Sequence, residues 1–194
     1  MSSPSRIFGL VEDRRHEQLL YRYLLCAGMR RDEIVIDISP SAYGAAEQWV
    51  RVNFPRFTRE CRRRNARAST AMFVFLDADT RTVQERLDIL DISLREDGQL
   101  PFDSDRDRIV RLIPKRNVET WILFLAGRGS AEPPIDEIVD YKRTKDPDEW
   151  SDLIPVAAQV FFAWTKPSGA LPANTIDSLR RGIMEIRRVL PAER

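Results

Sequence analysis

Three carboxylates occupy positions in which they could hold a divalent metal ion. Glu12 directly follows the apolar run RIFGLV at 6–11, and Asp77 and Asp79 follow the apolar run TAMFVFL at 70–76. If the two runs are neighbouring parallel strands, the three side chains meet at the carboxyl edge of one sheet, where such sheets bind ligands. Like charges this close are costly without a cation among them, and oxygen ligands suit Mg²⁺ or Mn²⁺. The alternative is turn and capping chemistry, for which aspartate is common after a strand.

Other ionisable side chains are expected near the same edge. Glu17 comes about one helical turn after Glu12 and is either a further metal ligand or an exposed helix residue. Lys115 and Arg116 follow a later apolar run and are either a clamp for phosphate or part of a basic loop. Glu119 comes next and either acts in the site or stabilises its helix through the helix dipole.

The segment from Arg51 to Arg67 is strongly basic, with seven arginines and a single acid. One interpretation is the solvated end of a helix, where cations interact favourably with the dipole. The other is a surface for the phosphate backbone of nucleic acid, whose geometry the guanidinium group matches. The candidate contacts are Arg59, Arg62, Arg63, Arg64 and Arg67.

The chain alternates between strand-like and helix-like segments, and these elements must position the groups above. Apolar or β-branched runs predict strands at 6–11, 33–38, 70–76 and 108–113. Helical patterns follow the strands: over 16–27, from about 43 to 64 with a kink or a new start at Pro55, after an N-cap at Thr80, and after an N-cap at Asn117. This order predicts an α/β fold with a mainly parallel sheet of about four strands and helices on both faces.

The remaining third of the chain is predicted to be helical. We expect residues 1–127 to form the α/β core and residues 128–194 to form a helical C-terminal extension, packed on the core as one compact unit. The apolar residues of this extension are interpreted either as core or as a surface for a dimer or another partner. They are Trp150, Phe161, Phe162 and Trp164.

Composition excludes several classes of protein. With 194 residues, of which 43% are hydrophobic and 31% charged, the chain fits a single globular domain. No apolar run approaches the ~20 residues that span a bilayer, and the N-terminal segment becomes charged too early for a secretory signal, so we expect a cytoplasmic protein. Cys26, Cys61 and His16 lack the spacing of a zinc site, and both thiols are expected to pack as small apolar residues.

Several of these segments resemble Toprim domains. IFGLVEDRRHEQLLYRYLL resembles the first strand and helix of that family, where a glutamate ends the strand, and MFVFLDADT resembles its D-x-D strand. IPKRNVETWILFL and SLRRGIMEIRRVL are similar to segments of small stand-alone Toprim-like proteins related to the overcoming-lysogenization-defect nucleases. The resemblance covers most of the chain and implies a Toprim/Rossmann-like fold and metal-dependent phosphodiester hydrolysis on nucleic acid.

The resemblance also implies roles for individual residues. Glu12 matches the strand-one glutamate, a metal ligand or general acid/base, while Asp77 and Asp79 match the metal-binding D-x-D. Glu119 matches the acid of the ETW segment. The family further implies Mg²⁺ or Mn²⁺ as cofactor, DNA in preference to RNA as substrate, and an ATPase partner in phage defence. The chain departs from the family at Asp13, where Toprim domains commonly have glycine.

Two other functions fit parts of the sequence. DADTRT resembles the motif of haloacid-dehalogenase-like phosphatases, with Asp77 as the nucleophile. That motif normally lies on an early strand and carries glycine after its second aspartate, unlike this one. The other alternative is a non-catalytic Toprim-like adaptor that binds a partner ATPase, which the replacement of glycine by Asp13 favours.

Overall fold

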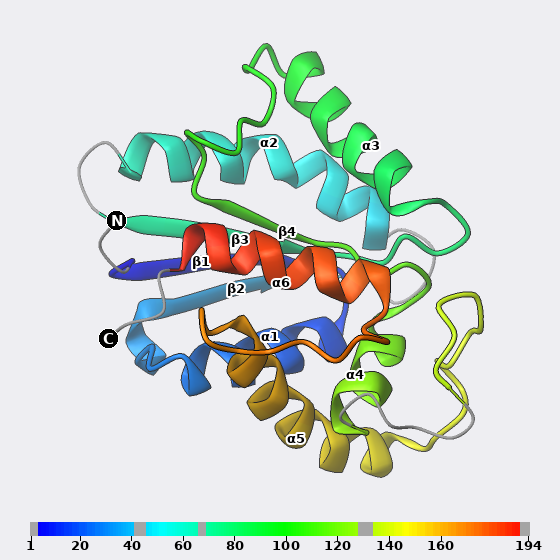
Figure 1. The fold of residues 1–194 in the computed structure, drawn as a ribbon. Coiled ribbons are helices and arrows are strands. Elements are labelled where there is room, and N and C mark those ends of the chain that lie inside the picture. The colour runs from blue at the N-terminus through cyan, green and yellow to red at the C-terminus, as the bar shows by residue number, and fades with distance from the viewer. Residues whose placement is uncertain (1–3, 41–45, 66–68, 128–133, 191–194) are drawn as a thin grey trace.

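In the computed structural model, which describes residues 4–40, 46–65, 69–127 and 134–190, four parallel strands form the centre of the protein (Figure 1). The strands are β1 (Arg6–Val11), β2 (Ile34–Ile38), β3 (Thr70–Phe75) and β4 (Ile109–Leu112). They are hydrogen-bonded in the order β2-β1-β3-β4. The predicted α/β class and parallel sheet are confirmed, and every strand boundary lies within a residue of its predicted position.

Helices cover both faces of this sheet, as predicted. They are α1 (Arg14–Cys26), α2 (Ala46–Asn65), α3 (Val83–Glu96), α4 (Val118–Ala126), α5 (Pro147–Thr165) and α6 (Asp177–Val189), with a 3-10 turn at Arg31–Glu33. α1, α4, α5 and α6 pack on one face, and α2 and α3 pack on the other (Figure 1). Trp150 and Phe161 of α5 are buried in the same hydrophobic cluster as α1, which confirms their interpretation as core.

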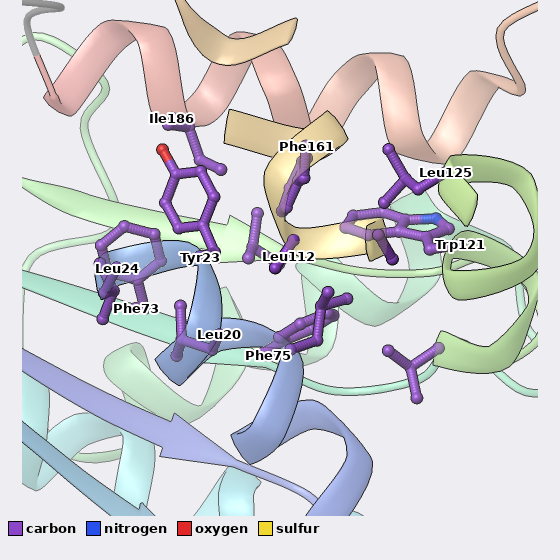
Figure 2. Packing of buried hydrophobic residues seen from close by; sticks show 14 of the residues in the cluster. Leu20, Tyr23, Leu24, Phe73, Phe75, Leu112, Trp121, Leu125, Phe161 and Ile186 are labelled. Atoms are coloured by element: carbon purple, nitrogen blue, oxygen red, sulfur yellow. The ribbon is translucent and has the colours of Figure 1, made fainter. Parts of the chain in front are cut away.

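Side chains along β3 alternate between two hydrophobic cores. Phe73 and Phe75 point toward α1, and the ring of Phe75 lies 5.6 Å from that of Trp121 on α4 (Figure 2). Met72 and Val74 point the opposite way, toward α2 and α3. Because both faces of this strand are buried, its sequence is continuously apolar instead of alternating.

Three local features of the helices differ from the predictions. α2 continues through the buried Pro55, so no new helix begins there. α3 is capped by Thr82 instead of Thr80, because Thr82 and Glu85 satisfy each other's backbone N–H groups in a capping box, at 3.1 and 2.6 Å. Residues 134–146, which we call the connector, form turns instead of helix, since aspartate side chains there accept hydrogen bonds from nearby backbone N–H groups.

Candidate metal centre at the carboxyl edge of the sheet

The carboxyl edge of the sheet has a topological switch point between β1 and β3. From β1 the chain continues to β2 on one side and then to β3 on the other, which is the arrangement that places ligands between the two strands. Glu12 follows β1 and Asp77 follows β3, and the backbone N–H of Asp77 donates to Glu12 Oε2 at 2.8 Å. The backbone N–H of Glu12 donates in turn to Phe75 O at 3.1 Å. The predicted meeting of these two carboxylates is confirmed.

Glu12, His16 and Asp77 together form a cluster that could bind a metal ion. One possible ligand atom from each lies within 4.8 Å of the others. His16 and Asp77 have no exposed surface, whereas Glu12 is half-buried. The metal site predicted from the sequence is confirmed to this extent, and His16 is a member that sequence reasoning missed.

His16 is held between two carboxylates. Its Nδ1 lies 2.8 Å from Asp13 Oδ1, its Nε2 lies 2.9 Å from Asp77 Oδ1, and its ring stands edge-on to Phe75. Burial alone would lower the pKa of His16, but the charges of Asp13 and Asp77 outweigh burial and raise it well above its ordinary value of 6.5. With both ring nitrogens engaged, His16 orients Asp77 in the way that hydrogen-bonded partners orient metal ligands.

Asp13, at the position where Toprim domains commonly have glycine, has two structural roles in this protein. It is the N-cap of α1, and its Oδ1 accepts hydrogen bonds from the backbone N–H groups of Arg15 at 2.9 Å and His16 at 3.1 Å. The same oxygen contacts the His16 ring. Burial would raise the pKa of Asp13, but the charge and hydrogen bonds of His16 hold it well below its usual range. Asp13 therefore both starts the helix and fixes the histidine.

The surroundings of Glu12 in the cluster destabilise its charged form. Burial, and after it the negative charge of Asp77, raise the pKa of Glu12 from 4.5 to about 7. His16 and the N–H of Asp77 act in the opposite direction but do not cancel the rise. A carboxyl with this pKa is partly protonated at neutral pH, and a cation beside it would favour its charged form.

A lysine from the connector supplies such a cation. Lys142 Nζ lies 3.1 Å from Asp77 Oδ2 and 3.7 Å from Asp79 Oδ1. Burial would lower the pKa of Lys142, but Asp77 and then Asp79 raise it above its usual value. Asp79 adopts a left-handed backbone conformation with φ 54°, and its side chain is 44% exposed. It reaches the centre through Lys142 and lies outside the cluster of close ligand atoms, so its role as a ligand stays a prediction.

Glu119 lies behind the cluster, in the first turn of α4. It is fully buried, and its Oε1 pairs with the guanidinium of Arg15, which also stacks over Trp150 at 5.3 Å. Burial, and then the charge of Asp77, raise the pKa of Glu119. Its Oε2 has no hydrogen-bond partner among the described residues. Glu119 thus adds negative charge near Asp77 without joining the close cluster.

Three other residues that the sequence predicted to act at the site form ion pairs or hydrogen bonds within the protein near this edge. Glu17 pairs with Arg14 at 2.8 Å and lies outside the close cluster. Lys115 donates to the carbonyl of Arg81 at 2.7 Å, and Arg116 lies 3.6 Å from Asp140 of the connector. Lys115 and Arg116 directly follow Pro114, and the carbonyl of Pro114 accepts from Ala78 N–H at 2.8 Å, so both basic residues lie at the predicted edge.

The arginine cluster of α2 does not face the carboxylates. α2 returns the chain from the carboxyl edge of β2 to the amino edge of β3, so its C-terminal end lies at the opposite edge of the sheet. Arg63 and Arg64 there line a hollow with Arg6 and Thr70, the first residues of β1 and β3. The arginine cluster therefore lies away from the candidate metal centre.

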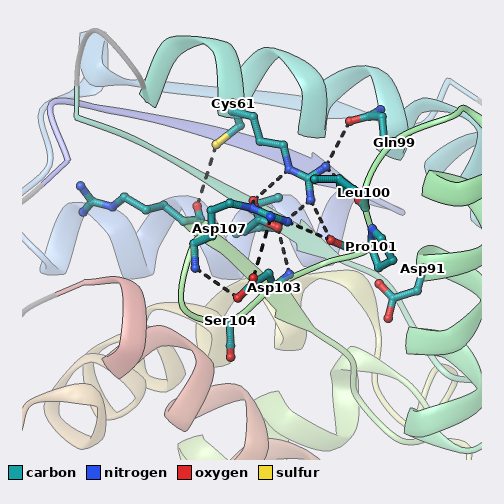
Figure 3. Close-up of polar contacts among 12 residues, drawn as sticks. Cys61, Asp91, Gln99, Leu100, Pro101, Asp103, Ser104 and Asp107 are labelled. Atoms are coloured by element: carbon teal, nitrogen blue, oxygen red, sulfur yellow. Dashed lines mark hydrogen bonds and ion pairs between the residues drawn. The ribbon is translucent and has the colours of Figure 1, made fainter.

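Two other members of the arginine cluster are held by acids. Arg62 forms a two-point ion pair with Asp107, at 2.6 and 2.9 Å, and donates to the carbonyls of Leu100 and Pro101 (Figure 3). Arg59 pairs with Asp97. Arg62 therefore fastens the loop before β4, while Arg67 lies outside the described residues.

Comparison of the chain with models of protein families, with curated proteins and with solved structures found no match. None of the helices in the described ranges is long and apolar enough to cross a membrane. The fold class and the candidate metal centre therefore rest on the geometry above.

Proposed function

We propose that the protein is a divalent-metal-dependent nuclease that hydrolyses phosphodiester bonds of DNA or RNA. The observation that supports this most is the meeting of Glu12 and Asp77, from two different strands, at the switch point of a parallel sheet. The donors are mainly carboxylate oxygens, which Mg²⁺ and Mn²⁺ prefer. The resemblance of the E…D-x-D residues to Toprim domains supports the same chemistry.

In this proposal Glu12, Asp77 and Asp79 hold the ion, which when bound activates water and neutralises charge on a phosphate. His16 fixes the orientation of Asp77, since its Nε2 lies 2.9 Å from Asp77 Oδ1. Asp13 fixes the ring of His16 from the other side. Both oxygens of Asp77 already face cationic groups, His16 and Lys142, so a metal ion on Asp77 competes with Lys142.

The test is cleavage of supercoiled plasmid and of single-stranded DNA and RNA with Mg²⁺ or Mn²⁺. We expect wild type to cleave, and Asp77→Asn and Glu12→Gln each to lose at least a hundredfold in rate. Asp88→Asn, which removes an exposed carboxylate on α3, is the matched control and should cleave like wild type. Equal cleavage by wild type and Asp77→Asn would show that the activity does not come from this site.

One observation favours a second function, that of a metal-free adaptor. Lys142 Nζ already lies between Asp77 and Asp79, so a cation of the chain itself stands among the carboxylates. An adaptor would show no heat of Mn²⁺ binding in calorimetry and no metal-dependent cleavage. A nuclease would bind Mn²⁺, and Asp77→Asn would abolish the binding.

The biological setting proposed here rests on the family resemblance alone. We propose a partner ATPase, self-association of the chain, and a role in phage defence. Co-expression with a candidate ATPase encoded beside this protein tests the partnership, because a true partner co-purifies and changes the rate of DNA cleavage. An adaptor would co-purify in the same way, but without any requirement for metal.

A further inference from the structure

The edge strand β2 is uncovered on the α2 side of the sheet. α2 packs against β1 and β3, so the neighbouring edge strand β2 has its α2-facing side chains open. Val35 of β2 is 38% exposed there, and its register partner Phe8 on β1 is half-buried. The result is a groove between α2 and the edge of the sheet.

This groove consists of two hollows that share Arg63. The first, of about 460 Å³, lies between α2 and the open strands and is lined by Phe8, Val35, Asp37, Arg56, Phe57, Arg59, Glu60 and Arg63. The second, of about 400 Å³, lies at the amino edge of the sheet and is lined by Ser5, Arg6, Arg30, Asp32, Glu33, Arg63, Arg64 and Thr70. Because Arg63 lines both, the two hollows adjoin at its side chain.

Aromatic rings and guanidinium groups are paired along the groove. The guanidinium of Arg64 lies over the ring of Phe8 at 5.0 Å, and that of Arg56 lies over the ring of Phe57 at 4.8 Å. Unpaired bases stack on aromatic rings and on the planes of guanidinium groups, so each pair offers a flat surface to a base. Such a pattern at the floor of a groove suits a single strand, because the bases of a duplex face each other and cannot reach the rings.

The charge of the groove is positive. Its lining holds six arginines and four acids. Arg6 and Arg56 form no ion pair with any residue in the described part of the chain. Arg63 pairs with Glu60 but keeps a side chain that is 62% exposed. A polyanion with flat, apolar bases complements both properties of this surface.

We propose that this groove binds single-stranded nucleic acid. Phe8 and Phe57 with their arginines contact the bases, and Arg6, Arg56 and Arg63 contact the phosphates. Phe8 precedes Glu12 by four residues on β1, about 13 Å along the strand. A nucleic acid that fills the groove and extends along β1 by this distance would reach the candidate metal centre. The groove would then be a substrate site of the proposed nuclease, and that role rests on the proposed function.

The test is fluorescence anisotropy with a labelled oligothymidine and a duplex of equal length, in EDTA so that no cleavage occurs. We expect wild type to bind the single strand at least tenfold more tightly than the duplex. Arg56→Gln should weaken binding and lower the slope of log affinity against log salt by about 0.7, the value for one lost phosphate contact. Phe57→Leu keeps an apolar side chain but should weaken binding about fivefold or more, through lost stacking.

The matched control is Arg95→Gln, which removes an exposed arginine from α3, away from the groove. Its affinity should equal that of wild type. The proposal is overturned if Arg95→Gln weakens binding as much as Arg56→Gln, if duplex binds as tightly as single strand, or if polyglutamate competes as well as the oligonucleotide. Single-strand binding without any metal-dependent cleavage would refute the nuclease function and leave the binding site standing.

Discussion

Replacing Glu12 by glutamine should stabilise the protein at alkaline pH in the absence of metal. The pKa of Glu12 is raised from 4.5 to about 7, so ionising this carboxyl is harder in the folded protein than in the unfolded chain. One unit of pKa corresponds to about 1.4 kcal/mol, which puts the cost at about 2–3 kcal/mol after allowance for the partial exposure of Glu12. Glutamine keeps an oxygen that can accept the 2.8 Å hydrogen bond from Asp77 N–H but carries no charge.

The size of this stabilisation depends on pH. Because the folded-state pKa is the higher one, the contribution of Glu12 to stability is fully present below pH 4.5 and is lost as the pH rises through about 7. Wild type and Glu12→Gln should therefore have similar free energies of unfolding at pH 4.5, and the variant should be about 2–3 kcal/mol more stable at pH 8. Urea denaturation in EDTA at both pH values measures the difference.

Metal should reverse this order of stability. At a Mn²⁺ concentration one thousand times its dissociation constant, wild type should gain about 4.1 kcal/mol, whereas Glu12→Gln should gain little. The matched control is Glu17→Gln, in the first turn of α1 and outside the cluster, and its stability should stay within about 0.5 kcal/mol of wild type. A difference between Glu12→Gln and wild type that does not change between pH 4.5 and 8 would refute the reasoning.

Three further predictions concern the surroundings of the site. Asp13→Ala should lower the free energy of unfolding, measured in urea, by about 2–3 kcal/mol, because it removes the N-cap of α1 and leaves Nδ1 of the buried His16 without its partner. A loss under about 0.5 kcal/mol would contradict this. Lys142→Met should raise Mn²⁺ affinity about 5–30-fold in calorimetry, because it removes a competing cation whose ion pair with Asp77 contributes about 1–2 kcal/mol. An unchanged affinity would show that the metal binds elsewhere. Gly182→Ala should cost about 1–3 kcal/mol in thermal unfolding, since its Cβ would lie 2.5 Å from Trp121; an unchanged Tm would contradict it.

The elements that build the sheet could be predicted from the sequence because their signals are local. Each strand is a short apolar or β-branched run, and each boundary coincides with a change in polarity. The meeting of Glu12 and Asp77 follows from one further assumption, that β1 and β3 are neighbours, which the strand order confirms. The N-cap of α4 at Asn117 was also predictable, since its side chain accepts from Thr120 N–H at 3.2 Å.

The rest of the site depends on contacts between distant parts of the chain. Lys142 lies 63 or more residues from the carboxylates it contacts, in a segment whose composition predicts nothing about its position. His16 did carry a local signal. Asp13 and His16 are three residues apart at the start of a helix, a spacing that places both on one face. What the sequence could not show is that Asp77 would meet the other side of the same ring.

The topology of the sheet also predicts where the arginine cluster lies. A right-handed crossover between parallel strands must return the chain to the amino edge of the sheet before the next strand begins. The arginines come directly before β3, so they belong at the edge opposite to Asp77. The pattern of charge alone says nothing about the edge of the sheet, but the direction of the chain separates the arginines from the carboxylates.

The candidate metal centre couples the charge of the site to the position of the connector. Lys142 forms ion pairs with Asp77 and Asp79, and the connector that carries it is fastened through Asp140, which accepts from Asn117 at 2.9 Å. A metal ion on the same carboxylates competes with the ammonium, since two cations so close repel each other. Binding of metal and release of Lys142 are then linked, and linkage is reciprocal. Whatever displaces the connector raises the affinity for metal, and removing the metal favours the return of the lysine.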